Sequence, residues 1–323
     1  MNLLKELKGC KTIGITGHTK PDGDCVGAVM SMYLYLKKTM PLATIVPMIE
    51  TPGAEFGVIS CIDEINTDFS TDIDKFDAFI GLDCSTQDRY GDALGYFENA
   101  KKTIVVDHHV SNDGFGDVSY IDPKASSTSE LVFDLIEEKY LDIEIAKALY
   151  IGIIHDTGVL QYSCTSPKTL RIVARLLEFG FDFSKIIDET FYEKTRLQNE
   201  MLGRALVESI MFADGRCIVS KIDKKIMEFY GATPHDFEGI VSQLRYTKGV
   251  EVAIFMYELE PLEYKVSLRS KGLVDVSKIA KFYNGGGHQR AAGCTVHGTF
   301  HDCVNNISDS IMIQLDRKNI ELG

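Results

Sequence analysis

Short apolar runs alternate with longer amphipathic segments over the first half of the chain. The runs are rich in Ile and Val, apolar at nearly every position, and lie at 12–16, 43–49, 77–83 and 103–107. Such runs predict parallel strands that are buried on both faces. Helical patterns between and after them run from near Cys25 to about Lys38 and over 127–140, 144–156 and 167–180. The N-terminal part is therefore predicted to be an α/β domain, with a mostly parallel sheet and helices on both faces.

The pattern changes after Met211. Strands are expected at 215–222 and, joined by a turn at Glu260–Pro261, within 249–270; a helix at 274–283, a Gly-rich strand entry at 285–296 and a last helix at 301–316 complete the pattern. This order of predicted strands and helices indicates a smaller C-terminal α+β domain. The predicted organisation is a first domain at 1–185, a charged linker helix region at 186–211 and a second domain at 212–323.

The composition is that of an ordinary globular protein. The chain has 323 residues, of which 45% are hydrophobic and 25% charged, and no apolar stretch approaches the length of a membrane span. The first ten residues predict a short amphipathic helix and not a signal peptide. The eight cysteines are scattered without a CxxC pair. They indicate reduced thiols, so we expect a cytoplasmic protein that does not bind membranes.

The net charge of -13 restricts the partners. Proteins that follow long nucleic acids usually carry a basic stripe, and the sequence has none, so we expect no long duplex as a partner. If the substrate is anionic, metal ions or a few arginines have to supply the positive charge locally.

Acidic and imidazole side chains follow three of the predicted strands. His18 follows the first, Asp83 ends another, and Asp107, His108 and His109 end a third. Ligands of open α/β sheets bind at the carboxyl ends of the strands, and neighbouring parallel strands would bring these side chains together. The loop after the first strand, "KPDGD", adds Asp22 and Asp24. These two also have a structural explanation, because "KPDG" suits a turn and Asp24 suits the cap of a helix that begins near Cys25.

A further carboxylate, Asp156, follows an apolar helix. Carboxylates gathered at strand ends repel one another unless a cation lies between them. Oxygen and imidazole ligands favour Mn²⁺, Mg²⁺ or Fe²⁺ over structural zinc. The ligands suffice for two ions that share one carboxylate, and two ions about 3.5–4 Å apart recur in phosphoester hydrolysis.

Five segments, in chain order, resemble the motifs of the DHH phosphoesterase superfamily. Four are "HTKPDGD", "GLDCS", "VVDHHVSN" and "IIHDTG"; "NGGGHQRAAG" resembles the signature of the DHH-associated C-terminal domain of the RecJ-like branch. The resemblance covers essentially the whole chain. It implies an active site in the cleft between two domains. The layout is similar to that of stand-alone bacterial oligoribonucleases that also hydrolyse 3′-phosphoadenosine 5′-phosphate (pAp).

The resemblance also implies roles for single residues. Two Mn²⁺ ions are expected, with Mg²⁺ as the alternative; one would be held by His18, Asp22 and Asp83, and the other by Asp24, Asp83, His108 and Asp156. Asp83 would thus bridge them. Asp107 would orient a histidine by a hydrogen bond, and His109 would point at the substrate phosphate, which makes these two the expected catalytic residues.

The C-terminal glycines allow two interpretations. Gly285, Gly286 and Gly287 could simply form a tight turn, but N–H groups of a Gly-rich loop also bind anions. The resemblance implies that these glycines bind substrate phosphate together with His109, Arg269, His288 and Arg290.

Four further features receive no definite functional role. Asn284 stands where the family usually has a fourth glycine, and asparagine tolerates left-handed geometry. His155 is interpreted as a core histidine or as a group that tunes the site locally, and Arg89 has either a structural or a substrate-side role. The segment "STSE" at 127–130 is a capping-box pattern that opens a helix, and a helix N-terminus near a phosphate site can also help to bind anions.

The expected function is a metal-dependent phosphoesterase, in which hydroxide activated by two ions attacks phosphorus in line. Its substrates would be RNA of a few residues, pAp or linear dinucleotides. A cyclic di-AMP phosphodiesterase of the same superfamily is an alternative. A manganese pyrophosphatase is opposed by "GGGHQRAAG", and a non-hydrolytic regulatory nucleotide-binding protein by the intact ligand positions. The oligomeric state, a homodimer included, is left open.

Overall fold

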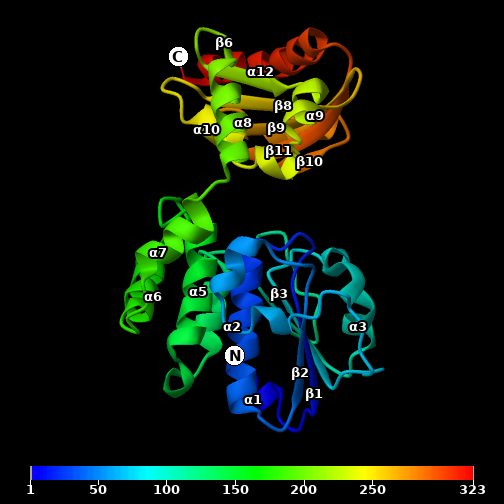
Figure 1. Cartoon of the computed structure of the whole chain (residues 1–323), viewed down its shortest axis with the longest axis vertical. Helices are drawn as coiled ribbons and strands as arrows, with labels where there is room; N and C mark the ends of the chain where they lie inside the picture. The colour runs from blue at the N-terminus through cyan, green and yellow to red at the C-terminus, as the bar shows by residue number, and fades with distance from the viewer. Residues whose placement is uncertain (1, 323) are drawn as a thin grey trace. The chain divides into compact units, whose positions relative to one another are not determined.

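The structure, a computed structural model, describes residues 2–322 and their side chains up to residue 316. Contacts divide the chain into two compact units, Met1–Glu193 and Lys194–Gly323, coloured blue to green and green to red in Figure 1. Each unit has its own sheet and its own hydrophobic core. The predicted α/β and α+β architectures are both confirmed.

The N-terminal unit is built on a five-stranded parallel sheet. Its order is β2-β1-β3-β4-β5, with bounds Thr44–Met48, Thr12–Thr16, Ala78–Leu82, Thr103–Asp107 and Val118–Ile121. The first four strands match the apolar runs of the sequence. The edge strand β5 was not predicted, since it has four residues, one of them exposed, and lacks a long apolar run.

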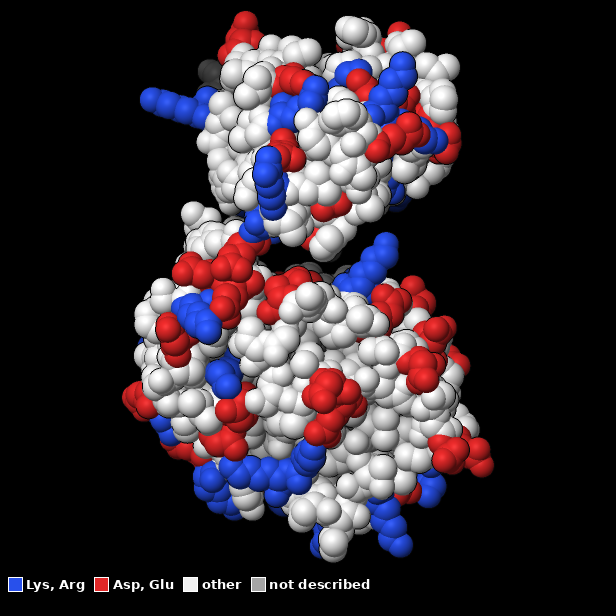
Figure 2. All heavy atoms as spheres, in the orientation of Figure 1, with Lys and Arg blue, Asp and Glu red and all other residues white. Residues whose placement is uncertain are grey.

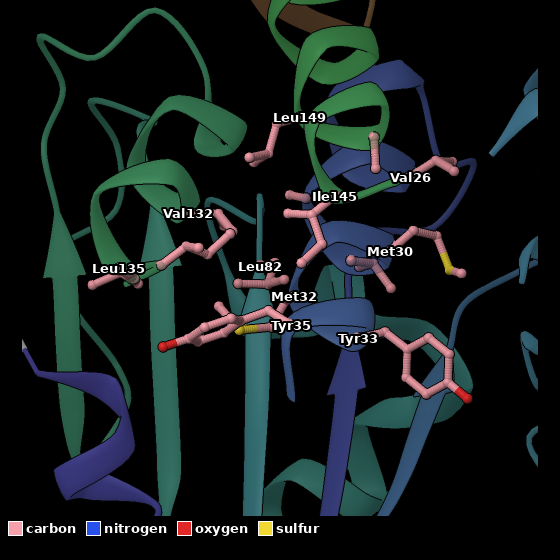
Figure 3. Packing of buried hydrophobic residues seen from close by; sticks show 14 of the residues in the cluster. Val26, Met30, Met32, Tyr33, Tyr35, Leu82, Val132, Leu135, Ile145 and Leu149 are labelled. Atoms are coloured by element: carbon pink, nitrogen blue, oxygen red, sulfur yellow. The ribbon is translucent and has the colours of Figure 1, made fainter. Parts of the chain in front are cut away.

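Helices cover both faces of this sheet. Their bounds are Leu3–Glu6 (α1), Gly23–Thr39 (α2), Leu94–Asn99 (α3), Thr128–Leu135 (α4), Ile143–Asp156 (α5), Pro167–Leu177 (α6) and Phe183–Ile187 (α7). On one face, side chains such as Met30 of α2 and Ile145 of α5 pack with Leu82 of β3 (Figure 3). On the other face, Phe97 of α3 packs with Phe79 of β3. Burial on both faces explains why these strands lack polar alternation.

Two glycines bring three helices unusually close together. A Cβ atom on Gly27 of α2 would lie 2.6 Å from the carbonyl oxygen of Ala148 in α5. A Cβ atom on Gly152 of α5 would lie 1.9 Å from Oγ of Ser129, at the start of α4. Larger residues would push the helices apart, and the carboxylates that these helices carry would separate with them.

The segment predicted as a linker contains more than one helix. A π-helix at Asp188–Tyr192 follows α7, and α8 spans Arg196–Val207. Met201 and Ala205 of α8 are buried in a core cluster of the C-terminal unit. The contacts therefore separate the units between Glu193 and Lys194, within the predicted linker. The domain boundaries at 185 and 211 stay predictions.

The C-terminal unit contains a six-stranded mixed sheet. Its order is β10-β11-β9-β8-β7-β6, with bounds Gly286–His288, Ala291–His297, Glu263–Ser270, Val252–Glu260, Cys217–Ile222 and Ile210–Phe212. β7 and β8 pair in parallel, and the other neighbouring strands of this order pair antiparallel. Helices α11 (Val276–Phe282) and α12 (Phe300–Leu322) pack on one face, and α8 and α10 (Ile240–Arg245) on the other. The short helices α9 (Lys224–Tyr230) and α10 were not predicted.

The acidic excess of the chain belongs to the N-terminal unit. That unit has 31 Asp and Glu against 17 Lys and Arg, whereas the C-terminal unit has 16 against 17. On the visible face, acidic and basic side chains are interspersed (Figure 2). Within residues 2–322, no helix has both the length and the apolar character that a bilayer span requires.

Candidate functional site

The carboxyl ends of three adjacent strands carry the predicted site residues. β3 lies between β1 and β4 in the sheet. His18 follows β1 by two residues, Asp83 comes directly after β3, and Asp107 is the last residue of β4. His108 and His109 come next in the chain. The parallel order thus brings these side chains to one edge of the sheet, as the strand pattern predicts.

The two aspartates of "KPDGD" lie where β1 leads into α2. Asp22 is the N-cap of α2, and its Oδ1 accepts the backbone N–H groups of Asp24 and Cys25, at 3.1 Å each. The suggestion that Asp24 caps a helix beginning near Cys25 is therefore wrong, because the helix already begins at Gly23. Asp24 lies inside the first turn and is 1% exposed.

The structure brings all six predicted ligands to this sheet edge. Three groups have ligand atoms within 4.8 Å of one another: His18, Asp22 and Asp83; Asp24, His108 and Asp156; and Asp83, His108 and His109. Asp83 belongs to two of these groups. The first group is the ligand set that the resemblance implies for one ion. The second group contains three of the four ligands implied for the other ion; the fourth, Asp83, does not lie within 4.8 Å of all of them. Their metal-binding roles stay a proposal.

The carboxylate of Asp83 lies between two imidazoles. Its Oδ2 is 3.5 Å from Nε2 of His18, and its Oδ1 is 3.7 Å from Nε2 of His108. The Asp83 backbone has a φ of +53°, in the left-handed region that non-glycine residues seldom adopt and Asp tolerates better than most. Such strained residues concentrate at functional sites.

Burial, hydrogen bonds and neighbouring charges shift the pKa values of the clustered side chains. Burial opposes protonation of His18, but hydrogen bonds with Asp22 and Asp83 outweigh it and raise the pKa of the imidazole to about 10. Burial, followed by the charges of Asp83 and Asp156, raises the pKa of Asp24 well above its ordinary value. Burial also raises the pKa of Asp156 to about 7; the neighbouring His108 opposes this shift, and Asp83 adds to it. A bound cation would offset both desolvation and repulsion.

The donor set fits a hard divalent cation. The ligand atoms are carboxylate oxygens and imidazole nitrogens, the donors that Mn²⁺ and Mg²⁺ accept. Nδ1 of His18 is 2.9 Å from the carbonyl oxygen of Thr19, which can only accept, so Nε2 is the nitrogen available as a ligand. The nearby thiol of Cys25 is buried, and burial raises its pKa well above the ordinary value. It is a poor thiolate ligand.

Asp107, which was expected to orient a histidine, forms its hydrogen bond with His109. Nδ1 of His109 is 2.7 Å from Oδ1 of Asp107, which is fully buried. Nδ2 of Asn112 donates to the other oxygen of Asp107 at 2.8 Å. The hydrogen bond to Asp107 raises the pKa of His109. These contacts fix the ring with Nδ1 occupied and Nε2 available for another partner.

Sequence reasoning missed two residues beside this cluster. The backbone N–H groups of Thr128 and Ser129 donate to the two oxygens of Asp24, at 2.6 and 2.9 Å. The hydroxyl of Thr128 donates to Oδ1 of Asp83 at 3.0 Å. The sequence held a signal in "STSE", which predicts the helix start correctly. Ser127 is the N-cap, but Glu130 bonds with Ser126 and does not complete the reciprocal box.

In the C-terminal unit, Arg269 and His288 lie on one face of the sheet. Ala291 of β11 pairs with Arg269 of β9 on one side and with His288 of β10 on the other. Directly paired residues point to the same face, so the two cationic side chains flank Ala291. The small residues Ser267 and Gly293 pair next to them on this face. Arg269 is half-buried, and His288 is exposed.

The Gly-rich segment is a strand and not a free loop. Cβ atoms on Gly285 and Gly287 would lie 2.2 and 2.5 Å from carbonyl oxygens of β11. The N–H of Gly285 donates to the carbonyl of Ala280 and is thus already bonded. Close packing therefore explains Gly285 and Gly287, whereas Gly286 is exposed and faces open space. The exposed Arg290 has its guanidinium beside Gly272.

Comparison with known proteins connects the two units to one family. Residues 12–153 match the DHH family, N-terminal domain, and residues 214–312 match the DHHA1 domain. A probable bifunctional oligoribonuclease and PAP phosphatase NrnA of Streptococcus mutans is 31% identical over 90% of this chain and 91% of its own length. The chain belongs to the DHH family.

Two further comparisons extend over nearly the whole DHH chain. The bifunctional oligoribonuclease and PAP phosphatase NrnA of Bacillus subtilis is 27% identical and covers 91% of this chain and 92% of its own. The crystal structure of an exopolyphosphatase-related protein from Bacteroides fragilis is similar with a TM-score of 0.87 and 24% identity. It covers 96% of this chain and 94% of the other, and it supports the fold.

Within the DHHA1 domain, Asn284 has a φ of +56°. This is the left-handed conformation that a glycine would adopt without strain and that asparagine tolerates. The departure from the family pattern therefore leaves the backbone turn before β10 intact.

The two residues without an assigned role have different surroundings. His155 packs between the rings of Phe56 and Phe191, and its Nε2 is 3.1 Å from Oγ1 of Thr190. This supports the interpretation of a structural histidine. The backbone carbonyl of Arg89 accepts the N–H of Thr19 at 2.8 Å, which ties its loop to the segment that carries His18.

Proposed function

We propose that this protein is a metal-dependent phosphoesterase that hydrolyses short nucleotide substrates. These are oligoribonucleotides of a few residues, pAp and linear dinucleotides. The two activities in the names of the S. mutans and B. subtilis relatives support this substrate class. The acidic N-terminal unit also favours small substrates, because it would repel a long polyanion.

The observation that carries the proposal is the position of Asp83. One of its oxygens faces His18 and the other faces His108, and each imidazole belongs to its own group of potential ligands. A carboxylate in this position suits a ligand shared by two ions. We assign His18, Asp22 and Asp83 to one ion and Asp24, Asp83, His108 and Asp156 to the other, with Mn²⁺ preferred and Mg²⁺ as the alternative. Bound ions would neutralise charge on the phosphoryl oxygens and lower the pKa of the attacking water.

The protein's own residues would bind and orient the substrate. His109, held by Asp107 through Nδ1, offers Nε2 to the scissile phosphate. Arg269 and His288, which share one sheet face, would bind a second phosphate or a neighbouring part of the substrate. Arg290 and the exposed Gly286 are further candidates for this role. Gly285 and Gly287 would act indirectly, by allowing β10 to approach β11.

Cyclic di-AMP hydrolysis is the second candidate activity of the same site. The DHHA1 match argues against the pyrophosphatase, and the complete ligand groups argue against a non-hydrolytic regulator. The cytoplasmic location and the absence of a membrane or long duplex partner stay predictions, and the oligomeric state, a homodimer included, stays open.

A parallel substrate assay tests the proposal. Chelator-treated protein would be supplied with Mn²⁺ and offered pAp, RNAs of two to five residues, linear and cyclic di-AMP, and pyrophosphate. We expect Mn²⁺-dependent hydrolysis of pAp and the short RNAs, and none of pyrophosphate. Preferential hydrolysis of cyclic di-AMP would replace the substrate assignment with the second candidate, and no hydrolysis of any phosphoester would contradict the proposal.

A further inference from the structure

The first turn of α4 contacts two carboxylates that come from different parts of the chain. The N–H groups of Thr128 and Ser129 donate one hydrogen bond to each oxygen of Asp24. The Thr128 hydroxyl donates to Oδ1 of Asp83, 45 residues away in sequence. One residue, Thr128, therefore contacts both acids.

These contacts account for the free donors at the start of the helix. The first N–H groups of an α-helix have no partner within it. Here the N–H groups of Thr128 and Ser129 are bonded to Asp24, and that of Glu130 is bonded to Oγ of Ser127 at 3.0 Å. The positive end of the helix also stabilises a nearby negative charge. These backbone donors thus offset part of the cost of burying the Asp24 carboxylate.

A second network of buried hydrogen bonds supports the first turn of α4. Oε2 of the buried Glu130 accepts the hydroxyl groups of Ser126 and Thr169, at 2.7 Å each. Gly152 of α5 leaves the space in which Ser129 lies. Ser126, Thr128 and Ser129 are fully buried, so water does not compete for these hydrogen bonds. The donors are held at fixed positions before any ligand binds.

We infer that Thr128 is a positioning residue that sets the relative orientation of Asp24 and Asp83 for cation binding. The inference rests on the proposed metal-dependent function and deepens it. Each carboxylate uses part of its acceptor capacity on the first turn of α4 and keeps the rest for an ion. Groups that orient metal ligands by hydrogen bonds typically contribute 10–100-fold to metal affinity. We expect a loss in this range when the Thr128 hydroxyl is removed.

Calorimetric titration of the metal-free full chain with Mn²⁺ alone tests this. Thr128→Val removes the hydroxyl but keeps the shape and the backbone N–H, and Thr128→Ser keeps the hydroxyl. Ser31→Ala is the control, because Ser31 is also fully buried in the N-terminal unit and its hydroxyl donates to the backbone carbonyl of Ala28, which is not a candidate ligand. Thermal unfolding of each metal-free variant reports separately on folding.

Thr128→Val is expected to bind Mn²⁺ about 10–100-fold more weakly, with Thr128→Ser and Ser31→Ala close to the wild type. Unchanged Mn²⁺ affinity in Thr128→Val would overturn the inference, and so would an equal loss in Ser31→Ala. If Thr128→Val does not fold, Thr128→Ala is titrated and judged by the same criteria. A wild-type chain that binds no Mn²⁺ would instead refute the metal assignment of the proposed function.

Discussion

Nε2 of His18 lies 3.5 Å from Oδ2 of Asp83, while Oδ1 of the same carboxylate faces His108. The two histidines come from different strand ends, and β3, which leads into Asp83, lies between those strands. The position of β3 in the sheet thus decides which acid contacts both imidazoles. A shared carboxylate at the centre of the cluster is what distinguishes a two-ion site from two separate one-ion sites.

Asp107→Asn should lower kcat/KM by about 10–100-fold, the usual cost of losing a residue that orients a histidine. The hydrogen bond to Asp107 raises the pKa of His109, so the protonated form persists to higher pH in the wild type. If protonated His109 binds the phosphate, activity falls as the pH rises through that pKa. In Asp107→Asn the pKa is lower, and the alkaline decline of the pH–rate profile should move to lower pH.

The matched test for this pair is a double-mutant cycle. In a His109→Gln background, Asp107→Asn should cause little further loss. Additive losses would show that Asp107 acts independently of His109, and the positioning role would then be wrong.

Arg269→Ala should chiefly raise KM for substrates that carry a second phosphate, such as pAp. A contact made equally in the ground and transition states affects KM, whereas one made only in the transition state affects kcat. A simple monophosphodiester should be affected much less. Steady-state kinetics on both substrate types tests this, with Lys265→Ala, four residues along the same strand and on the same face, as the control.

Equal losses on both substrate types would assign Arg269 to the chemistry or to the fold. An equally large effect of Lys265→Ala would show that Arg269 acts only by general charge attraction and not by a specific contact.

Asp156→Asn should stabilise the metal-free protein at pH 8. Burial raises the pKa of Asp156 to about 7, so the folded state favours the protonated acid. That stability is fully present below the ordinary pKa of 3.8 and is lost as the pH rises through about 7. Asparagine carries no charge and removes this loss, so Tm should rise by about 2–4 °C for each kcal/mol gained in the free energy of unfolding. Thermal unfolding in the presence of a chelator measures this change in Tm.

The gain should shrink as the pH falls below the ordinary pKa of 3.8, where Asp156 is protonated in both the folded and the unfolded chain, and Mn²⁺ should stabilise the variant less than the wild type. A variant less stable than the wild type at pH 8 without metal would show that the burial of this charged carboxylate is not what limits the stability of the metal-free protein.

The site residues at the sheet edge could be predicted from the sequence, because they follow short apolar runs that indicate buried strands. Apolar runs define β1, β3 and β4, and the parallel order then brings His18, Asp83 and His108 together. The edge strand β5 was not predicted, because its four partly exposed residues show no periodic pattern.

The contacts that orient the acids could not be predicted in the same way. Whether Asp22 or Asp24 caps α2 depends on a shift of two residues in the helix start, which the turn signal does not resolve. The hydrogen bond from Thr128 to Asp83 joins positions 45 residues apart and depends on the packing of α4. The sequence predicted a Gly-rich strand entry at 285–296 but not that the glycines before His288 form a separate strand, since glycine is uncommon in strands and here serves close packing.

The most direct test is a low-temperature EPR titration of the metal-free chain with Mn²⁺, compared with Asp83→Asn. Asparagine suits the left-handed backbone at this position, so the variant should fold. The wild type should bind two ions per chain as a spin-coupled pair and hydrolyse pAp, while Asp83→Asn should lose both the coupling and the turnover. A wild type that binds one isolated ion, or an Asp83→Asn variant that keeps the coupled pair and its activity, would contradict the shared-carboxylate account.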